Sequence, residues 1–352
     1  MTGVQTCALP ISIVILNYNG TELLNRYLPK LQDLTQLGDV ILVDNASFDG
    51  SVLHVMNRFS WIKTHTLPHN FGYAGGYNLA LKELQHTYFL ILNNDLWISK
   101  LSVEYLLTYM QQHPECAAAQ PLILSDRTAG YFDYAGAAGG QMDILGYPFC
   151  RGRILDTCEP NQQQYATTQN IAWVGGACCI IRRQDFETAG GFSKDFFSHM
   201  EEIDLCWRFL RMQKKLAVVA EAEAFHWGGG TLSAGSSQKI YFNYRNNLMM
   251  LFRNLPVLHL VWILPLRLLL DGLSCLPYVM QFKFYYVASV LKAHGAFYKA
   301  LPKLIQFRKE WNRIAAPCLP SCFYKGSIVW DYLVLKKRKF SDLKFKSSNT
   351  GL

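Results

Sequence analysis

The decapeptide LILNNDLWIS, Leu90–Ser99, joins a short apolar run to two amides and a carboxylate. Its first three residues, 90–92, have the uninterrupted apolar pattern of a strand that is buried on both faces of a sheet. We expect this strand to end at Asn93, Asn94 and Asp95. Such an end is either an ordinary turn or a place where the sheet presents Asp95 to a charged ligand.

Two further strands are expected to end in polar residues. SIVILN (Ser12–Asn17) and VILVD (Val40–Asp44) are short and apolar, and a helical pattern follows each of them. Short strands that alternate with helices indicate an α/β fold with a mostly parallel sheet covered by helices on both faces. Ligands of such sheets bind at the carboxyl ends of the strands. Three polar ends therefore outline a site: Asn17-Tyr18-Asn19, Asp44-Asn45 and Asn93-Asn94-Asp95.

The composition is that of a globular protein. Half of the 352 residues are hydrophobic and 17% are charged, which suits one large domain with an appended region. The net charge is +8, and the basic run 336–339 suits an anionic membrane surface or a nucleic acid, or is merely a solvated end. The ten cysteines form no Cys-x-x-Cys pair, which indicates a reduced, cytoplasmic protein without a disulfide framework or zinc site.

The chain divides into three parts. Residues 1–11 lack the basic start and apolar stretch of a secretory signal, and we expect them to be a non-native or disordered start. Residues 12–253 are the predicted catalytic domain, and residues 254–352 are a helical extension rich in basic and aromatic residues. Segment 129–170 is rich in Gly, Tyr and Gln, and is expected to form loops and a short irregular β segment that closes over a substrate.

The extension has features of a membrane-surface segment. Arg267 and Asp271 interrupt its apolar stretch, and Pro265 is expected to break it. The longest uncharged run, Asn254–Leu266, is too short to span a bilayer as one helix. Phe282–Lys303 mixes aromatics with lysines, which suits a helix lying among lipid headgroups. The alternative is a set of helices packed on the catalytic domain or in a dimer.

Two common nucleotide-binding motifs are missing. The first strand is followed by Asn17-Tyr18-Asn19-Gly20 rather than by Gly-x-Gly-x-x-Gly, and the chain has no Gly-x-x-x-x-Gly-Lys-Ser loop. These absences argue against nicotinamide redox chemistry and against phosphoryl transfer on a phosphate loop.

The chain instead carries eight motifs in a fixed order. They are VILNYNG (Val14–Gly20), VDNASFDGS (Val43–Ser51), HNFGYAGGYN (His69–Asn78), LNNDL (Leu92–Leu96), WVGGACCIIRR (Trp173–Arg183), GGFSKDFFSHMEEIDLCWR (Gly190–Arg208), HWGGGT (His226–Thr231) and YFNYRNN (Tyr241–Asn247). Together they closely resemble the family 2 glycosyltransferases of the GT-A fold, and within them the rhamnosyltransferase-like branch that builds bacterial cell-surface polysaccharide. The resemblance runs from about residue 12 to residue 253.

The resemblance implies a nucleotide-sugar site at the strand ends. Asp44 matches the carboxylate that accepts a hydrogen bond from uracil or thymine, although an Asp there also suits a helix cap or an Asx turn, which fits Asn45 and Ser47 better. Arg245, with Tyr241, would bind phosphate, or else lies on a solvated helix face. The other residues assigned to the nucleotide sugar are Tyr18, Asn19, Asn70, Gly72, Asn78, Asn93 and Asn94.

The resemblance also implies a metal ion. Asn93-Asn94-Asp95 resembles the family's Asp-x-Asp motif, with Asn93 at the first Asp, so Asp95 would bind Mg²⁺ or Mn²⁺. His226 matches a further metal ligand, although a lone histidine also suits a structural role. The loss of one carboxylate at Asn93 predicts weaker metal affinity rather than none.

The catalytic base is expected in EEID, residues 201–204. Glu202 matches the family's base and would take a proton from the acceptor, with Glu201 as the alternative base. Asp204 belongs to the same motif, but it also stands four residues before Arg208 and can pair with it on a helix. The glycines at 175 and 176 are expected to border the acceptor sugar beside an apolar platform. That platform is Trp173, which is equally suited to the core. The residues assigned to the acceptor are therefore Trp173, Gly175 and Gly176.

The predicted activity is metal-dependent, inverting transfer of a sugar from a nucleoside diphosphate to a saccharide or lipid-linked acceptor. By resemblance, dTDP-rhamnose is the first choice of donor, and a dTDP- or UDP-sugar is the wider class. We expect a peripheral protein at the inner face of the cell membrane and no nucleic-acid partner. Two alternatives stay open: a sugar nucleotidyltransferase, and a non-catalytic saccharide-binding relative, which Asn93 and Glu202 suggest.

Overall fold

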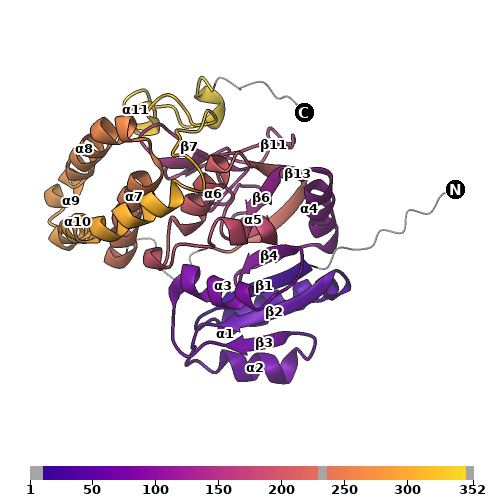
Figure 1. The fold of residues 1–352 in the computed structure, drawn as a ribbon. Coiled ribbons are helices and arrows are strands. Elements are labelled where there is room, and N and C mark those ends of the chain that lie inside the picture. The colour runs from indigo at the N-terminus through magenta and orange to yellow at the C-terminus, as the bar shows by residue number, and fades with distance from the viewer. Residues whose placement is uncertain (1–10, 229–235, 346–352) are drawn as a thin grey trace.

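The computed structural model describes residues 11–228 and 236–345, and Figure 1 shows their arrangement. A central sheet lies between helices, and the last helices of the chain form a separate layer beside it. Residues 1–10 lie outside the described residues. Ile11, which the sequence analysis assigned to the excluded start, is fully buried as the first residue of strand β1.

The central sheet is mostly parallel, as predicted. Its order is β11-β13-β6-β12-β4-β1-β2-β3, with β5 paired to β13. The pairs β1–β2, β1–β4, β2–β3 and β13–β6 are parallel, whereas β12, β11 and β5 run antiparallel to their partners. The strands are β1 (Ile11–Asn17), β2 (Gly38–Asp44), β3 (Lys63–Thr66), β4 (Tyr88–Asn93), β5 (Leu96–Ile98), β6 (Cys116–Ser125), β11 (Gln169–Asn170), β12 (Cys178–Arg182) and β13 (Lys215–His226).

Helices cover both faces of this sheet, which explains why its strands are apolar without alternation. Val14 of β1 packs in one core cluster, and its neighbours Ile13 and Ile15 pack in the other. The flanking helices are α1 (Thr21–Tyr27), the 3₁₀ segment Leu28–Gln36, α2 (Ser51–Arg58), α3 (Gly72–Lys82), α4 (Lys100–Gln112), α5 (Arg183–Thr188) and α6 (Glu201–Arg211).

The polar strand ends meet at one edge, as predicted. In the register of the sheet, Asn17 of β1 lies beside Asp44 of β2, and Leu16 lies beside Asn93 of β4. The reversed strand β12 reaches the same edge with its first residues, because the Asn93 amide N–H donates to the Ala177 carbonyl at 2.9 Å. The strand expected over residues 173–182 begins only at Cys178.

Segment 129–170 forms a small sheet of its own, in agreement with the expected short β segment. Its order is β10-β9-β8-β7. These strands are β7 (Gly140–Met142), β8 (Pro148–Cys150), β9 (Arg153–Ile154) and β10 (Thr157–Cys158). Closure of this segment over a substrate stays a prediction.

The C-terminal extension is helical, and Figure 1 shows it as a layer to the left of the sheet. In this layer, α10 of the extension packs against α7, which lies almost wholly before residue 254. Pro265 does not break the apolar stretch, because it lies inside α8 and the helix continues past it. The helices are α7 (Ser237–Asn254), α8 (Val257–Leu273), α9 (Leu276–Met280), α10 (Phe284–Trp311) and α11 (Ile328–Leu333).

The expectation that this stretch is too short for a membrane span is wrong. The helical segment Val257–Met280 has 24 residues with a mean hydropathy of 1.6, which is long and apolar enough to cross a membrane by length and composition alone. The expectation counted only the uncharged run, whereas the helix continues through Arg267 and Asp271. Only 17% of its most apolar window is buried.

Candidate active site

Buried amides join the ends of the three parallel strands. The Asn17 side-chain amide donates to Asp44 Oδ1 at 2.9 Å and to Ser51 Oγ at 2.9 Å. Asn94 Nδ2 in turn donates to Asn17 Oδ1 at 2.9 Å. All four residues are buried. The polar ends therefore form a rigid floor, in which Asn94 is a link between strands rather than a group directed at a ligand.

Asp44 forms an Asx turn with Ser47. Its Oδ2 accepts the Ser47 amide N–H at 2.8 Å, and its Oδ1 accepts the Ser47 hydroxyl at 2.5 Å. This is the local role that the sequence analysis considered more suitable for Asn45 and Ser47. Asp44 is 1% exposed, and both of its oxygens already accept hydrogen bonds. Its role in base recognition stays a prediction.

The β1 and β2 loops meet beside this turn. Asn19, with φ of 51°, accepts the Phe48 amide N–H on its Oδ1 at 2.9 Å. The rings of Tyr18 and Phe48 pack edge to face with centroids 6.3 Å apart. Phe48 is 83% exposed, and the sequence analysis did not single it out although it stands in the VDNASFDGS motif. The pair offers apolar surface next to the floor.

The start of α3 is fixed by the end of β2. Asn45 accepts the Phe71 amide N–H at 2.9 Å and donates to the Gly72 carbonyl at 2.9 Å. Asn70 Oδ1 accepts the Gly72 amide N–H at 2.8 Å. Gly72 has φ of 71°, and a Cβ there would lie 2.3 Å from the Phe197 carbonyl oxygen. The close approach that this glycine permits is to Phe197, and its contact with a nucleotide sugar stays a prediction.

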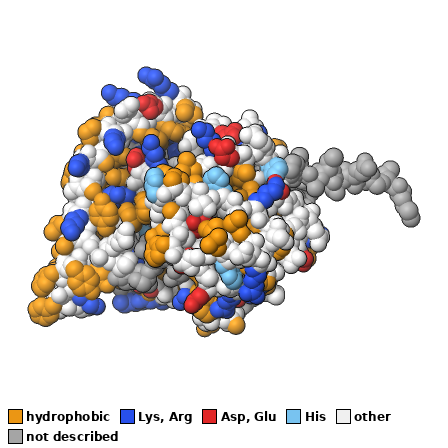
Figure 2. Space-filling view, turned by 90° about the horizontal axis from the view of Figure 1, so that it is seen from below, with side chains coloured by type: hydrophobic (Ala, Val, Ile, Leu, Met, Phe, Trp, Pro, Cys, Tyr) orange, Lys and Arg blue, Asp and Glu red, His pale blue; other side chains and the backbone are white. Residues whose placement is uncertain are grey.

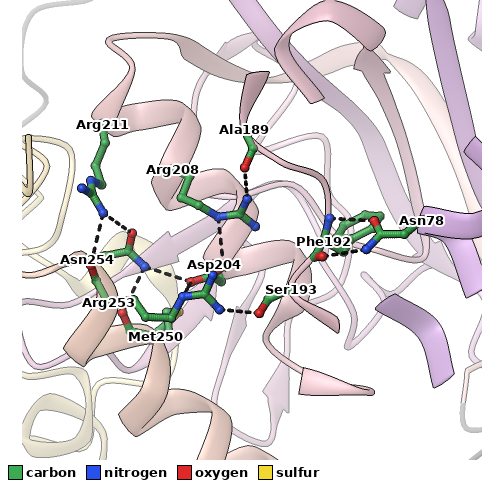
Figure 3. Close-up of polar contacts among 10 residues, drawn as sticks. All are labelled: Asn78, Ala189, Phe192, Ser193, Asp204, Arg208, Arg211, Met250, Arg253 and Asn254. Atoms are coloured by element: carbon green, nitrogen blue, oxygen red, sulfur yellow. Dashed lines mark hydrogen bonds and ion pairs between the residues drawn. The ribbon is translucent and has the colours of Figure 1, made fainter. Parts of the chain in front are cut away.

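Asn78 also has an internal partner. Its Nδ2 donates to the Phe192 carbonyl at 2.7 Å, and its Oδ1 accepts the Phe192 amide N–H at 2.9 Å, as Figure 3 shows. This pair of bonds ties α3 to the segment before α6. The predicted contact of Asn78 with the nucleotide sugar is not supported, because the amide is occupied by the backbone of Phe192.

Asp95 and His226 lie together, as the resemblance implied. His226 ends β13 and lies opposite Leu96, so its imidazole comes beside the carboxylate that follows β4. Nε2 of His226 lies 3.0 Å from Asp95 Oδ1, and Asn93 Nδ2 lies 3.5 Å from the same nitrogen. Nδ1 of His226 lies 2.9 Å from Asp133 Oδ2. Asp133 was missed because it stands in the Gly- and Tyr-rich segment, where no spacing marked it.

The charges of this group support one another. Burial alone would lower the pKa of His226, but hydrogen bonds to Asp133 and Asp95 and their negative charges outweigh burial and raise that pKa to about 10. All three side chains are at least nine-tenths buried. An imidazolium between two carboxylates is therefore the stable form of the site when no metal ion takes its place.

The donor set fits a hard or borderline divalent cation. A carboxylate oxygen and an imidazole nitrogen are ligands that Mg²⁺ and Mn²⁺ accept. A metal-binding histidine commonly donates its second N–H to a carboxylate, which is the relation of Nδ1 to Asp133. Within residues 11–228 and 236–345, no group of three or more Asp, Glu, His and Cys side chains could hold a metal ion. Among the described residues, Asp95 and His226 would thus supply two ligands, and substrate and water would supply others.

Two buried carboxyl groups, each with one unpartnered oxygen in the described part of the chain, open helix α6. In the described part of the chain, Oε2 of Glu201 and Oε2 of Glu202 are buried and have no hydrogen-bond partner. Burial raises the pKa of Glu202 to about 7. Burial, and then the nearby charge of Glu202, raise the pKa of Glu201 well above its ordinary value. The helix N-terminus favours the ionised form of both groups, but desolvation has the larger effect.

Gly176 connects the two acidic centres. A Cβ on Gly176 would lie 2.8 Å from Tyr73 Oη and 3.6 Å from Glu202 Cγ. The Tyr73 hydroxyl donates to the Gly176 carbonyl at 2.7 Å. The next residue, Ala177, accepts the Asn93 amide N–H. The start of β12 therefore borders both Glu202 and the Asn93-Asn94-Asp95 turn, and Tyr73 is a site residue that the sequence analysis missed.

The other predicted acceptor residues lie deeper. Trp173 is 4% exposed, and its Nε1 donates to the Gln141 carbonyl at 2.7 Å, so the core alternative holds for this residue. Gly175 donates its amide N–H to Gln120 Oε1 at 2.8 Å. Of the three residues, Gly176 is the one that reaches Glu202.

Asp204 is bound by other side chains inside the protein, which corrects its grouping with the catalytic acids. Its carboxylate accepts Arg208 Nε at 3.0 Å and Asn254 Nδ2 at 3.0 Å, and lies 3.7 Å from Arg253 Nε (Figure 3). It is fully buried. The pairing with Arg208 that the four-residue spacing predicted is confirmed. Asp204 is separated from Glu202 because residues 202 and 204 point to different sides of one helix.

The segment before α6 has left-handed backbone at three non-glycine residues, Phe197, His199 and Met200, with φ of 63°, 69° and 70°. Such conformations persist only where neighbours enforce them. Asn246 of α7 does so, because its Nδ2 lies 2.7–3.0 Å from the carbonyl oxygens of Phe196, Ser198 and His199. Helix α7 thus fixes the direction in which α6 presents Glu202.

Arg245 takes part in the same support. Its Nη2 donates to the carbonyls of Asp195 at 2.9 Å and Phe196 at 3.1 Å, and its Nη1 donates to the Tyr241 hydroxyl at 3.3 Å. The half-buried guanidinium already donates to protein acceptors, and its predicted role in phosphate binding stays a prediction. Backbone carbonyls and phosphates attract the same donors, so the sequence does not separate the two roles.

Known proteins match this arrangement. The sequence profile of glycosyl transferase family 2 matches residues 12–189, half of the chain. The chain belongs to glycosyl transferase family 2. It is thus a glycosyltransferase, a hexosyltransferase by its relatives.

A curated relative supports the rhamnosyltransferase-like branch. The N-acetylglucosaminyl-diphospho-decaprenol L-rhamnosyltransferase of Mycobacterium tuberculosis is 26% identical over 239 residues, which cover 63% of this chain and 76% of the relative.

Solved structures confirm the GT-A fold. GalNAc-T7, crystallised with UDP, GalNAc and Mn²⁺, matches with a TM-score of 0.59 at 13% identity over 94% of this chain and 57% of that one. S. aureus TarS in complex with UDP-GlcNAc matches with a TM-score of 0.56 at 16% identity over 87% of each chain. The sequence-based assignment of family and fold is therefore confirmed.

Proposed function

We propose that this protein is a metal-dependent inverting glycosyltransferase of cell-surface polysaccharide synthesis. One observation carries the proposal: Asp95 and His226, which come from distant parts of the chain, meet at 3.0 Å beside the start of β12, where Glu202 also lies. A leaving diphosphate and an acceptor hydroxyl require these two kinds of group within reach of one sugar.

Asp95 and His226 would hold a divalent cation, with Asp133 fixing the imidazole. When bound, such a cation neutralises the charge that develops on the departing nucleoside diphosphate. GalNAc-T7, which shares the fold, was crystallised with Mn²⁺, and this supports the proposal without distinguishing Mn²⁺ from Mg²⁺ here. The floor of Asn17, Asp44 and Asn94 would carry the nucleoside.

Glu202 would act as the general base. Its pKa of about 7 lets a large fraction of the carboxylate accept a proton at neutral pH. The acceptor oxygen forms its bond to the anomeric carbon while its proton moves to Glu202. The bond from that carbon to the diphosphate oxygen breaks, and its electron pair leaves with the diphosphate. A single displacement inverts the anomeric configuration and needs no nucleophile from the protein.

The donor is proposed to be a dTDP- or UDP-sugar, with dTDP-rhamnose first. The mycobacterial relative is named as an L-rhamnosyltransferase of N-acetylglucosaminyl-diphospho-decaprenol, and this supports rhamnose as the sugar and a lipid-linked saccharide as the acceptor. Such an acceptor lies at a membrane, so we place the protein at the inner face of the cell membrane as a peripheral enzyme.

Ligand-dependent thermal unfolding tests the donor and the metal together. We expect dTDP-rhamnose or a UDP-sugar to raise Tm in the presence of Mn²⁺ or Mg²⁺ and to have little effect with a chelator. Asp95→Asn should abolish the metal-dependent part, whereas Leu53→Gln on the exposed face of α2 should leave it unchanged. Equal stabilisation with and without metal, or an unaltered response in Asp95→Asn, would contradict the proposed metal site.

A further inference from the structure

Helix α8 is built with its charges inside and its apolar residues outside. Arg267 and Asp271 are 3% and 1% exposed, whereas Leu258, Val261 and Leu269 are 72%, 70% and 60% exposed. A helix on the surface of a water-soluble domain has the opposite distribution. An exposed apolar face of this kind marks a surface that binds a partner or a membrane.

The inner side of α8 is fixed to the rest of the protein. Arg267 donates to the Leu145 carbonyl at 2.8 Å and lies 3.6 Å from the centre of the Tyr147 ring, in the turn between β7 and β8. Asp271 lies 3.5 Å from Arg267 and 3.2 Å from His294 Nε2 of α10. These contacts tie α8 to the body of the enzyme along one side.

The exposed apolar side continues from α8 through α9. We call it the outer apolar surface and define it by Leu258, Val261, Leu269, Leu276, Met280 and Phe282, each at least 56% exposed. Figure 2 shows hydrophobic side chains gathered at the pointed end of the molecule, on the side where Figure 1 places α8–α10, with Lys and Arg side chains near them.

The charge around this surface has one sign. From residue 257 to residue 309 the only acidic residue is the buried Asp271, whereas five lysines are exposed: Lys283, Lys292, Lys299, Lys303 and Lys309. A second copy of the chain would bring the same positive charges against this face. Anionic lipid headgroups complement them.

We propose that the outer apolar surface inserts into one leaflet of an anionic membrane, with α8 and α9 lying flat and the lysines among the headgroups. The inference rests on the proposed peripheral location of the enzyme at a membrane. It assigns membrane insertion to α8 and α9 rather than to the Phe282–Lys303 helix. A span across the bilayer would move Arg267 and Asp271 into hydrocarbon and break their contacts with Leu145 and His294. The helix therefore lies on the membrane rather than through it.

Helix α7 contacts both the end of α8 and the segment before Glu202. The Tyr244 hydroxyl of α7 lies 2.6 Å from Ser274 Oγ, just after α8. Tyr244 is two residues from Asn246, which supports the segment before Glu202. A lipid-linked acceptor would thus have its headgroup at the level of the helices that hold the catalytic base.

Co-sedimentation of the full chain with vesicles tests the proposal. We expect binding to phosphatidylcholine vesicles that contain phosphatidylglycerol, and weaker binding at high salt. The variant Leu258→Gln, Val261→Gln, Leu269→Gln and Met280→Gln should lose binding on the order of 100-fold, because four apolar side chains no longer insert. The matched control replaces exposed residues of α2 and α4, as Leu53→Gln, Met56→Gln, Leu101→Gln and Tyr105→Gln, and should bind as the native chain does.

Each outcome decides something. Metal-dependent stabilisation by nucleotide sugar should persist in the quadruple variant, so a failure of membrane binding is distinguishable from a failure of the proposed enzyme activity. Binding by the quadruple variant equal to that of the native chain, or no binding by either, would overturn the proposal. A native dimer that the quadruple variant converts to a monomer would assign the surface to a second copy instead. A C-terminal tag protected from protease outside closed vesicles would show a span and overturn the flat orientation.

Discussion

The two sides of helix α6 differ in the hydrogen-bond partners that they give to a buried carboxyl group. On one side Glu202 has an unpartnered oxygen beside Gly176, and burial raises its pKa to about 7. On the other side, less than one turn further, Asp204 is held by Arg208 and Asn254 and is fully buried. Burial without a partner creates a proton acceptor, and burial with partners creates an anchor. The resemblance placed both residues in one catalytic motif, and the structure separates them.

Replacing the carboxyl group of Glu202 should have the largest effect on activity. Glu202→Gln keeps the shape of the side chain but cannot accept the acceptor proton, so we expect kcat to fall about 10²- to 10⁴-fold. Steady-state transfer from the identified nucleotide sugar measures this. Glu201→Gln is the matched control at the neighbouring position, and a larger loss in that variant would move the role of base to Glu201.

Removing the carboxylate on the anchored side should mainly affect stability. Asp204→Asn leaves Arg208 and Arg253 buried without a countercharge, and we expect the free energy of unfolding to fall by about 3–5 kcal/mol. Denaturant unfolding measures the change, and activity per folded molecule should stay near that of the native protein. A loss of kcat in a variant that remains fully folded would return Asp204 to the catalytic group.

The dependence of kcat/KM on pH tests the assignment of Glu202 as the base, and its expected effect is smaller. Protonation of Glu202 should reduce kcat/KM about tenfold for each pH unit below 7. Burial in the folded protein raises the pKa of Glu202 from its ordinary value of 4.5 to about 7. The protonated side chain therefore contributes fully to stability below pH 4.5, and this contribution is lost as the pH rises through 7. As the pH rises from 4.5 to about 7, Tm should therefore fall less in Glu202→Gln than in the native chain. A profile of kcat/KM that is flat between pH 5 and about 7 would contradict the assignment.

Sequence reasoning located the edge of the sheet because it rests on a simple rule. Parallel strands end at one edge, so the polar residues after Leu16, Val43 and Leu92 had to meet. The meeting of Asp95 with His226 followed from the family resemblance. Asp133 and Tyr73 could not be found in this way, because their partners are set by tertiary contacts between segments that carry no common spacing.

The limits of these predictions have a physical cause as well. Asn78 and Arg245 are hydrogen-bond donors that suit a nucleotide sugar, yet their donors are used by backbone carbonyls of the segment before α6. A sequence gives the donors of a side chain but not the acceptors it faces. In α8, Arg267 and Asp271 were read as interruptions of an apolar stretch, and only their burial shows that they point inward.

Strand β12 runs antiparallel to both of its neighbours, β4 and β6. Hydrogen bonding to β4 on one side and β6 on the other fixes the position of β12, so Ala177 stays against Asn93 whatever the preceding segment contains. The stretch after Asp133, up to residue 170, can then change in length and composition without disturbing the reacting groups. Relatives that glycosylate different acceptors are expected to vary most in this stretch, and exchanging it between them is a rational route to altered acceptor choice.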